Sequence, residues 1–293
     1  MNNLKTPNLL IIGAMKSYTT SFCFDLNRHP DVFIPESKEI NCLRCAESSI
    51  RTVKNAYNFY YRKRREKYLG EGSTSYTKFP CKPPVATLAR RCLLPETKII
   101  YLTRDPVERI KRHIAHEIGN GRSLEVPFCL VNDPQFIALS AYKMQLSFWH
   151  QSYPSSQILT LYSDDYGRDR LDLLRKSFAF LELDMNMSRF ADDSGSYLNR
   201  GLTKHTAYKS PLRFVLHSSF YPKLRERLPK KLRRWGAEKL LPLAGAPNRV
   251  EFSECVETGI RDAIYELNQL ERPKKSAVVD VLQVHLAKRI YAS

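Results

Sequence analysis

The sequence predicts an α/β fold in which a P-loop-like, mainly parallel sheet is flanked by helices. Short apolar, β-rich segments alternate with segments of helical spacing, which is the order of βαβ units. The strand candidates are 9–13, 68–71, 98–103 and 157–162. Polar loops follow three of these candidates, at 13–21, 71–76 and 103–106. Because parallel sheets bind ligands at the carboxyl ends of their strands, we expect the three loops to meet in one crevice.

Helices are expected between the strands. The first runs from Thr19 to Arg28 and ends at His29-Pro30, because the residue before a proline is disfavoured in a helix. Pro106 suits the first turn of another helix that continues to about Ile118. Further helices are expected at 48–67, 83–92, 134–151 and 168–183, and a short extended segment at 31–35. The run 98–103 is apolar enough to be a buried central strand.

The pattern weakens beyond about residue 190. We expect an extended polar loop at 191–210, a strongly basic helical segment at 211–234, a linker at 242–247 and helices at 254–272 and 276–291. The chain 1–293 is therefore expected to be a single domain. Its core lies at about 8–185, and a helical, basic C-terminal extension follows at about 190–293.

The charge of the chain favours anionic partners. Its 293 residues carry a formal net charge of +17, and 43% of them are hydrophobic, which is enough for a sizeable core. So much positive charge suits a nucleotide, an acidic polysaccharide, nucleic acid or an anionic membrane surface. Charge alone does not choose among these partners.

The seven cysteines are expected to be free thiols in a reducing compartment. Their number is odd, and Cys42 and Cys45 form a lone C-x-x-C without the second pair that a zinc site needs. A redox or metal role for this pair is the alternative. No signal peptide is recognisable, and no apolar run approaches the ~18–20 residues that cross a bilayer. These features predict a cytoplasmic protein without a membrane span.

The stretch from Leu9 to Ser21 has the order of a phosphate-binding strand, loop and helix. Gly13 ends the apolar run, Lys16 supplies a mobile positive charge, and hydroxyl residues open the helix. Backbone N–H groups and the positive end of the helix dipole then face an anion. The expected phosphate-contacting residues are Gly13, Lys16, Ser17, Tyr18, Thr19, Thr20 and Ser21. The alternative is an ordinary strand–loop–helix unit whose Lys16 is solvated.

Five segments in this order resemble the sulfotransferases that use 3′-phosphoadenosine 5′-phosphosulfate (PAPS). The segment 13–20 is similar to the family's 5′-phosphosulfate loop, G-x-x-K-x-G-T-T, and His29-Pro30-Asp31 with Lys38-Glu39 is similar to the H-P-D…K-E that follows it. The other segments are 71–76, 99–109 and 157–183. The resemblance covers roughly residues 8–185 and is nearest to the carbohydrate-sulfating branch, with its heparan-type enzymes and bacterial relatives.

The resemblance implies metal-free, in-line transfer of a sulfuryl group from PAPS to an acceptor hydroxyl, with adenosine 3′,5′-bisphosphate as the product. Negative charge builds on the bridging oxygen of the leaving group, and Lys16 is expected to stabilise it. The acceptor must lose a proton, and Glu39 matches the catalytic glutamate of heparan-type members. Arg104, with Arg112, is expected to bind the 3′-phosphate. The resemblance also implies a saccharide acceptor, and nucleic acid is not expected as a ligand.

Two of these assignments have a structural alternative. Glu39 is otherwise a surface carboxylate in a loop. Arg104 otherwise forms a helix-end salt bridge with Asp105 or Glu108. His113 lies on the helix after the Arg104 loop, where a structural or phosphate-proximal role is expected in preference to catalysis.

The chain departs from the family pattern where cofactor and acceptor would bind. Tyr18 stands at a usual glycine and is expected to reshape the loop or to lower cofactor affinity. Arg112 stands at a usual serine and needs a different geometry to reach phosphate. Gly72 replaces a lysine of some heparan-type enzymes, and Cys42-Leu43 replaces an aromatic pair. The last two departures leave the acceptor open.

Two other functions remain open. A P-loop kinase or NTPase would share the fold but needs G-x-x-x-x-G-K-[ST] and a magnesium-holding acid, whereas Lys16 here precedes the threonine pair. A catalytically degenerate sulfotransferase fold would bind acidic glycans or nucleic acid, as Tyr18, Arg112 and the net charge of +17 suggest. The basic segment 223–234 either helps to hold an acidic acceptor or is a solvated helix.

Overall fold

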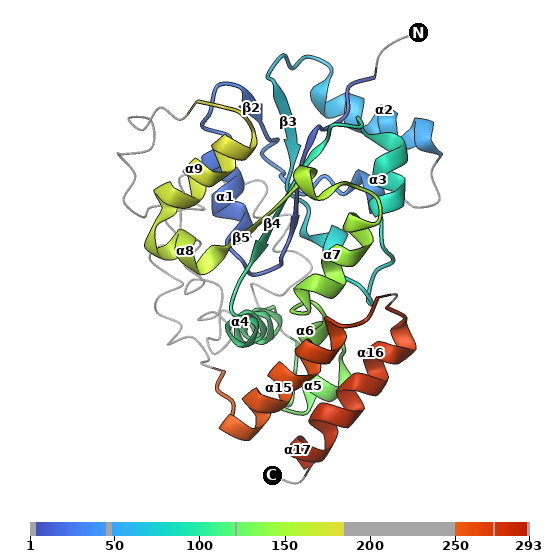
Figure 1. Ribbon diagram of the computed structural model, residues 1–293, viewed down its shortest axis with the longest axis vertical. Helices are drawn as coiled ribbons and strands as arrows, with labels where there is room; N and C mark the ends of the chain where they lie inside the picture. Colours follow the sequence, from blue (N-terminus) through green and yellow to red (C-terminus); the bar gives the residue numbers. More distant parts are fainter. Residues whose placement is uncertain (1–3, 45–48, 121, 185–249, 272, 292–293) are drawn as a thin grey trace, which may run out of the picture.

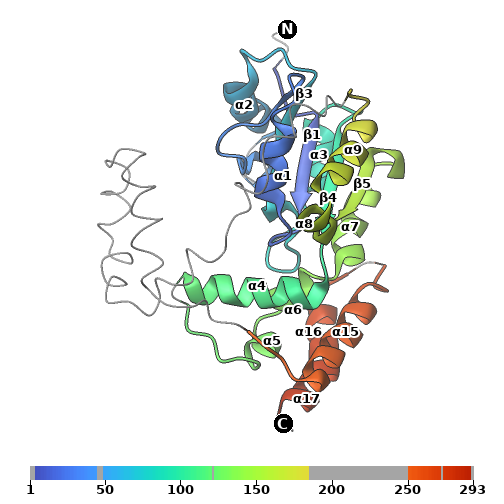
Figure 2. The same ribbon diagram turned by 90° about the vertical axis from the view of Figure 1, so that its left-hand side faces the viewer.

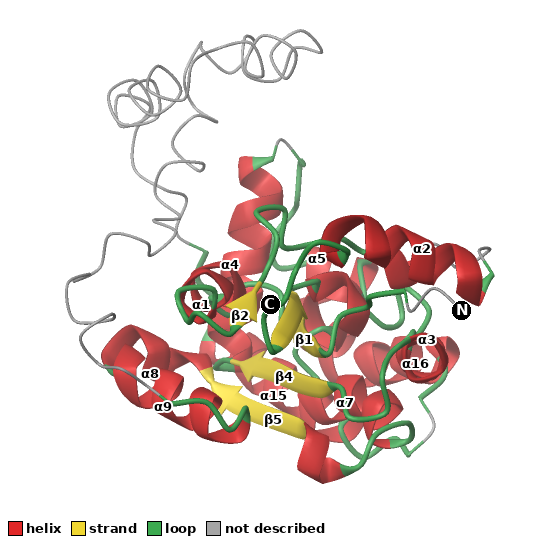
Figure 3. Cartoon of the chain, turned by 90° about the horizontal axis from the view of Figure 1, so that it is seen from above, coloured by secondary structure: helices red, strands yellow, loops and turns green. Residues whose placement is uncertain are grey.

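A parallel sheet organises the structure, a computed structural model that describes residues 4–44, 49–120, 122–184, 250–271 and 273–291 (Figure 1). The described residues form a five-stranded sheet of order β2-β3-β1-β4-β5, and each neighbouring pair is parallel. The strands are β1 (Leu9–Gly13), β2 (Val32–Phe33), β3 (Tyr68–Glu71), β4 (Lys98–Thr103) and β5 (Ile158–Tyr162). Figure 3 shows β1, β4 and β5 side by side. The predicted α/β fold with a parallel, P-loop-like sheet is confirmed.

Strands β1 and β4 are apolar along their length because both faces of the sheet are covered. Their side chains alternate between two cores, as the two-residue period of a strand requires. Leu9, Ile11, Ile100 and Leu102 belong to one core, and Leu10, Ile12, Ile99 and Tyr101 belong to the other. This burial explains the continuous apolar runs in the sequence and confirms 98–103 as an interior strand.

Helices cover both faces of the sheet (Figure 1). The helices on one face include α1 (Thr19–Leu26), α8 (Ser163–Arg168) and α9 (Arg170–Phe180). Phe22, Leu174 and Phe178 are among their buried apolar side chains. The helices on the other face are α2 (Ile50–Tyr61), α3 (Ala86–Cys92) and α7 (Tyr142–His150). Tyr57 and Trp149 bury their rings there.

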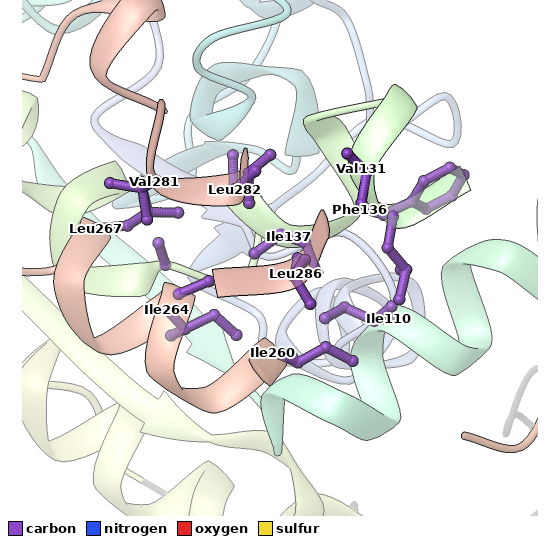
Figure 4. Close-up of a cluster of buried hydrophobic side chains, with 14 of the residues drawn as sticks. Ile110, Val131, Phe136, Ile137, Ile260, Ile264, Leu267, Val281, Leu282 and Leu286 are labelled. Carbon is purple, nitrogen blue, oxygen red and sulfur yellow. The ribbon is translucent and has the colours of Figure 1, made fainter. Parts of the chain in front are cut away.

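A third core lies at the end of the sheet toward which β1 points (Figure 2). It joins α4 (Pro106–Gly119), α5 (Cys129–Asn132) and α6 (Gln135–Ala138) to the C-terminal helices. These are α15 (Glu254–Leu267), α16 (Lys275–Leu282) and α17 (Lys288–Tyr291), with a π-helical turn at Gln283–Ala287 between the last two. Ile260, Ile264 and Leu282 face Ile110 and Ile137 across this core (Figure 4).

The prediction of one continuous helix at 134–151 is wrong. It breaks after Ala138 and resumes at Tyr142, giving α6 and α7. The break lets the buried guanidinium of Arg109 donate hydrogen bonds to the Ser140 hydroxyl and to the carbonyl of Phe136. A buried guanidinium without hydrogen-bond acceptors would be costly. The hydrogen bonds of the buried Arg109 on α4 therefore explain why the segment is interrupted although its spacing is helical throughout.

Other boundaries differ for local reasons. The helix expected at 48–67 ends at Tyr61, and residues 45–48 lie outside the described part. The helix expected at 168–183 begins at Arg170, because Asp169 caps it by accepting a 2.9 Å hydrogen bond from the N–H of Asp172. The helix expected at 254–272 is confirmed but ends at Leu267, and the helix expected at 276–291 begins at Lys275 and is interrupted by the π-helical turn between α16 and α17. The loop at 191–210, the basic segment at 211–234 and the linker at 242–247 lie outside the described residues.

The loops after β1, β3 and β4 converge, as predicted. The Thr77 hydroxyl, just beyond the β3 loop, donates a 2.7 Å hydrogen bond to the carbonyl of Ile12. Nη1 of Arg104, after β4, lies 3.5 Å from the carbonyl oxygen of Lys16. Helix α4 lies beneath this edge of the sheet (Figure 2). Among the described residues, no helix is both long enough and apolar enough to span a membrane.

Candidate active site

The loop between β1 and α1 is built by close backbone approaches. The register between β1 and β4 shifts between Ile11 and Gly13, and the N–H of Ala14 donates a 2.6 Å hydrogen bond to the carbonyl of Leu102. A Cβ on Gly13 would lie 2.4 Å from the Thr77 hydroxyl and 2.8 Å from the Tyr101 ring. Only glycine fits there, so the position of Gly13 follows from packing between three loops.

The hydroxyl residues of the loop differ in exposure. Thr19 and Ser21 are buried in the first turn of α1, and Thr20 is exposed. Ser17 is fully buried, and its hydroxyl has no hydrogen-bond partner in the described part of the chain. A buried hydroxyl without a partner is costly unless a ligand supplies one.

Lys16 and Tyr18 both have left-handed backbone conformations, with φ of 69° and 56°. Non-glycine residues rarely take this conformation, and a glycine at position 18 would take it without strain. The backbone at Tyr18 therefore takes a conformation that glycine adopts readily, and the expectation that Tyr18 reshapes the loop or lowers cofactor affinity stays a prediction. Its ring lies against Tyr166, at 5.8 Å between centroids, and under the guanidinium of Arg104, at 5.1 Å.

Arg104 is buried at the end of β4 and has an acidic partner. Its Nη2 lies 3.1 Å from Oδ1 of Asp164 in the first turn of α8, and its Nε is buried without a partner among the described residues. The structural alternative that paired it with Asp105 or Glu108 is wrong. Asp105 instead caps α4 by accepting a 2.9 Å hydrogen bond from the N–H of Glu108.

Glu39 lies in the loop beside β3 and is held by two donors. The ammonium of Lys38 is 2.9 Å from its Oε1, and the Thr74 hydroxyl donates to the same oxygen at 3.1 Å. Partial burial raises the pKa of Glu39, but the charge and hydrogen bond of Lys38 and the bond from Thr74 outweigh it, so the pKa ends below its ordinary 4.5. Glu39 is ionised at neutral pH and partly open to solvent.

Glu71 is a buried carboxylate that the sequence analysis did not assign to the site. It accepts 2.7 Å hydrogen bonds from the hydroxyls of Tyr57 and Tyr76 and from the N–H of Asn41. The Ser73 hydroxyl is a fourth donor. Burial raises the pKa of Glu71, although these hydrogen bonds oppose the shift. A charged residue ending a fully buried strand was the available sequence signal.

The glycine at 72 has a packing reason. A Cβ there would lie 2.5 Å from Sγ of Cys23 and 3.6 Å from the side chain of Lys38. Its N–H also donates a 2.9 Å hydrogen bond to the carbonyl of Lys38. Any side chain at position 72 would therefore require Cys23 of α1 to shift.

Lys78 is a further cation that the sequence analysis missed. It follows Thr77 directly and is half-buried. Burial lowers the pKa of Lys78; Lys82 and Arg109 lower it further, whereas Glu39 and Glu117 oppose the shift. Lys78 therefore senses charges on the Glu39 loop and on α4, which places it between them.

His113 is buried on α4 against the ring of Phe136, at 4.8 Å between centroids. Burial, with the positive charges of Arg109, Lys78 and Lys16, lowers its pKa to about 2. It is neutral at physiological pH. Arg112, one residue earlier, is exposed and has no hydrogen-bond or ion-pair partner among the described residues. The structure does not bring Arg112 to the buried groups around Arg104.

The six described cysteines are free thiols, and four of them are buried. Burial raises the pKa of Cys23 to about 12, which makes this thiol unreactive. Cys42 begins a short 3-10 turn, Cys42–Arg44. Cys45 lies outside the described residues.

The chain resembles known proteins in sequence and in structure. No family model matches it. A stretch of 104 residues is 32% identical to the membrane-associated sulfotransferase kil1 of Dictyostelium discoideum, covering 35% of this chain and 21% of that protein. The structure matches the crystal structure of a sulfotransferase from Alicyclobacillus acidocaldarius with a TM-score of 0.56 and 21% identity, over 78% of this chain and 100% of that one. The chain has the sulfotransferase fold.

The match spans about a fifth of the length of the curated relative, 21%. The sulfotransferase domain from the curacin biosynthetic pathway matches with a TM-score of 0.44 and 15% identity, over 63% of this chain and 77% of that domain.

The carboxyl edge of the sheet suits an anionic ligand. Of the buried polar atoms that lack a partner among the described residues, three follow the ends of neighbouring strands: Oγ of Ser17 after β1, Nε of Arg104 after β4 and Oγ of Ser163 after β5. All can donate to phosphate or sulfate oxygens. Lys16 and Lys78 add positive charge nearby. The described residues contain no group of three or more His, Cys, Asp or Glu that could hold a metal ion.

Proposed function

We propose that this protein transfers a sulfuryl group from PAPS to a hydroxyl group, on a carbohydrate, by in-line displacement. The observation that carries the proposal is the convergence of the loops after β1, β3 and β4, which hold Lys16, Thr74 and Arg104, with Glu39 hydrogen-bonded to Thr74. The fold of the Alicyclobacillus sulfotransferase and the short identity to kil1 support the same reaction. The carbohydrate acceptor rests on the resemblance of the motifs alone.

The loop 13–21 would hold the 5′-phosphosulfate, through backbone N–H groups and the hydroxyls of Ser17, Thr19, Thr20 and Ser21. PAPS supplies an activated sulfuryl group, and its transfer leaves negative charge on the bridging oxygen of the nucleotide. Lys16 would neutralise that charge, which is worth more in a partly buried crevice than in water. Arg104 would hold the 3′-phosphate, and Arg112 could join it only by a change of conformation.

Glu39 would accept the proton of the acceptor hydroxyl. Its lowered pKa keeps it ionised at neutral pH, as a base must be. Thr74 and Lys38 fix one of its oxygens and leave the other available. Lys78, half-buried beside this loop, would hold negative charge on the transferring group.

A P-loop kinase or NTPase has no observation in its favour beyond the fold. A degenerate sulfotransferase that only binds polyanions is favoured by the exposed Arg112 and by the net charge of +17. The glycine-type backbone of Tyr18 argues for a competent loop. A cytoplasmic location is part of the proposal and rests on the free thiols.

The proposal is tested first by thermal unfolding with adenosine 3′,5′-bisphosphate. At ~100 times its dissociation constant the nucleotide should stabilise the fold by about 2.7 kcal/mol, which raises the melting temperature by a few degrees. The shift should shrink in Lys16→Ala. Transfer of ³⁵S from labelled PAPS to a panel of saccharides then identifies the acceptor.

The alternatives predict different results. No stabilisation of the wild type would overturn the cofactor assignment. Nucleotide binding without transfer to any acceptor would favour the degenerate fold, and magnesium-dependent hydrolysis of ATP would favour the kinase or NTPase.

A further inference from the structure

Tyr18 has a strained backbone conformation, and its ring contacts both Tyr166 and Arg104. Its φ and ψ of 56° and 14° are left-handed, at the residue that precedes α1. A bulky side chain in this conformation persists only when its surroundings hold it there. The interactions of the ring, and not the backbone, must therefore explain why a tyrosine occupies this position.

One side of the Tyr18 ring lies against a fixed support. The ring of Tyr166 is 5.8 Å away between centroids, at an angle of 38°. Tyr166 is buried, and its hydroxyl donates to the carboxylate of Asp25 on α1. Arg170 of α9 donates to the same carboxylate through two nitrogens. Tyr166 is thus held through Asp25 to α1 and α9, and it forms a fixed contact surface for the Tyr18 ring.

The guanidinium of Arg104 lies over the Tyr18 ring. Its central carbon is 5.1 Å from the ring centroid, within the range of a cation–π interaction. Its edge is held separately, by Asp164 at 3.1 Å and by the carbonyl oxygen of Lys16 at 3.5 Å. Two edge contacts alone would let the planar group tilt about the line that joins them. The stacked ring removes that freedom.

The N–H groups that remain on Arg104 then point in a fixed direction. Every nitrogen of a guanidinium carries N–H, and the buried Nε has no acceptor among the described residues. An arginine whose plane is fixed in advance loses less entropy when it binds a forked anion such as phosphate. This gain in binding free energy applies only to the ligand group that contacts Arg104.

We propose that Tyr18 is a positioning residue that orients Arg104 toward the 3′-phosphate of the bound nucleotide, and so sets the preference of the chain for nucleotides that carry this group. This inference rests on the proposed function, because that function puts a 3′-phosphate at Arg104. Tyr18 itself needs no contact with the nucleotide. Its side chain acts through the face of the guanidinium.

Three variants separate the ring of Tyr18 from its backbone. Tyr18→Phe keeps the ring and removes only the hydroxyl. Tyr18→Gly and Tyr18→Asn remove the ring and tolerate the left-handed conformation, so the loop should fold. Isothermal titration measures the affinity of each for adenosine 3′,5′-bisphosphate and for adenosine 5′-monophosphate, which lacks the 3′-phosphate.

The proposal is tested by the ratio of the affinity for adenosine 3′,5′-bisphosphate to the affinity for adenosine 5′-monophosphate. We expect the ratio of Tyr18→Phe to stay within about twofold of the wild type, and the ratios of Tyr18→Gly and Tyr18→Asn to fall by roughly five- to tenfold. In an Arg104→Ala background, Tyr18→Gly should change the ratio no further, since the group that Tyr18 positions is absent. A wild-type ratio in Tyr18→Gly, or an equal further loss in the Arg104→Ala background, would overturn the proposal.

A measurement without ligand separates this proposal from the proposed function. The Nε–Hε order parameter of Arg104, assigned by comparison with Arg104→Lys, should be high in the wild type and in Tyr18→Phe and low in Tyr18→Gly. If the wild type binds neither nucleotide, the proposed function fails. An Arg104 equally ordered in all variants shows that Tyr18 does not position it, whichever ligand the crevice takes.

Discussion

The backbone N–H of Asn41 donates a 2.7 Å hydrogen bond to Oε1 of Glu71, a carboxylate without solvent exposure. Asn41 has a left-handed φ of 60°, and its amide donates to the carbonyl of Glu39 at 3.1 Å. The Ser75 hydroxyl donates to its side-chain oxygen. One residue thus connects the buried end of β3 to the proposed base, and Glu71 sets the place of Glu39 without touching it.

Replacing Glu71 should change how the stability of the protein depends on pH. Its pKa is raised in the folded state above the ordinary 4.5, chiefly by burial. Its protonated form therefore favours folding: this contribution is complete below about pH 4.5 and is lost as the pH rises through the folded-state pKa. Glu71→Gln is neutral at every pH. The unfolding free energy of the wild type minus that of Glu71→Gln, measured by urea titration, should fall as the pH rises above about 4.5.

Two further variants control that experiment. Glu71→Ala leaves three or more buried donors without an acceptor and should cost about 1–3 kcal/mol for each of them. Tyr57→Phe removes one of the donors that lower the pKa of Glu71 and keeps the carboxylate, so the pH dependence should remain but move to higher pH. A difference between wild type and Glu71→Gln that is flat with pH would show that Glu71 binds its proton equally in both states.

Removing the charge of Lys38 should move the acid limb of the transfer reaction. Lys38 is the main group that holds the pKa of Glu39 below 4.5 against the effect of burial. In Lys38→Met that pKa rises, so activity is lost at a higher pH as the solution is acidified. The measurement is the rate of adenosine 3′,5′-bisphosphate release from PAPS with acceptor, as a function of pH.

The matched control is Lys63→Met, which removes an exposed charge at the end of α2. It should leave the acid limb in place. Glu39→Gln should lower the rate by about 10²–10⁴-fold at all pH values. An unchanged acid limb in Lys38→Met would remove Glu39 from the role of base.

Asp164→Asn should strengthen anion binding at Arg104. The Asp164 carboxylate occupies one nitrogen of the guanidinium at 3.1 Å and would repel an incoming phosphate. The asparagine removes this charge, while Tyr18 and the Lys16 carbonyl still orient the arginine. We expect adenosine 3′,5′-bisphosphate to bind several-fold more tightly, with the gain reduced by salt. Asp172→Asn, an exposed change on α9, should have no effect, and weaker binding by Asp164→Asn would show that its carboxylate is needed to hold Arg104.

The C-terminal helices should unfold together with the sheet. Leu282 of α16 is buried in the core that joins α15–α17 to α4, so Leu282→Ala should cost about 2–5 kcal/mol. Calorimetry should show a single transition that moves to lower temperature. Val284→Ala, at a residue that is 64% exposed, is the control and should move it little. Two transitions of which only one moves would contradict the prediction of a single domain.

The sequence by itself determined the parallel sheet, most of its helices and the convergence of the loops after β1, β3 and β4. These features follow from local patterns, because apolar runs, helical spacing and glycine and proline positions constrain the backbone within a few residues. The roles of Lys16 and Glu39 remain predictions. The motif resemblance predicted the sulfotransferase fold that the structure shows.

Only the tertiary structure decided the partners of the charged groups. The pairing of Arg104 with Asp164, the burial of Glu71 among Tyr57 and Tyr76, and the break between α6 and α7 all depend on segments that are distant in the chain. No spacing records such pairings, because they follow from which strands become neighbours and which side chains then lose solvent. The ring of Tyr18 under Arg104 is of the same kind: its sequence position indicated a departure from glycine, and the packing of three segments gave that departure a physical role.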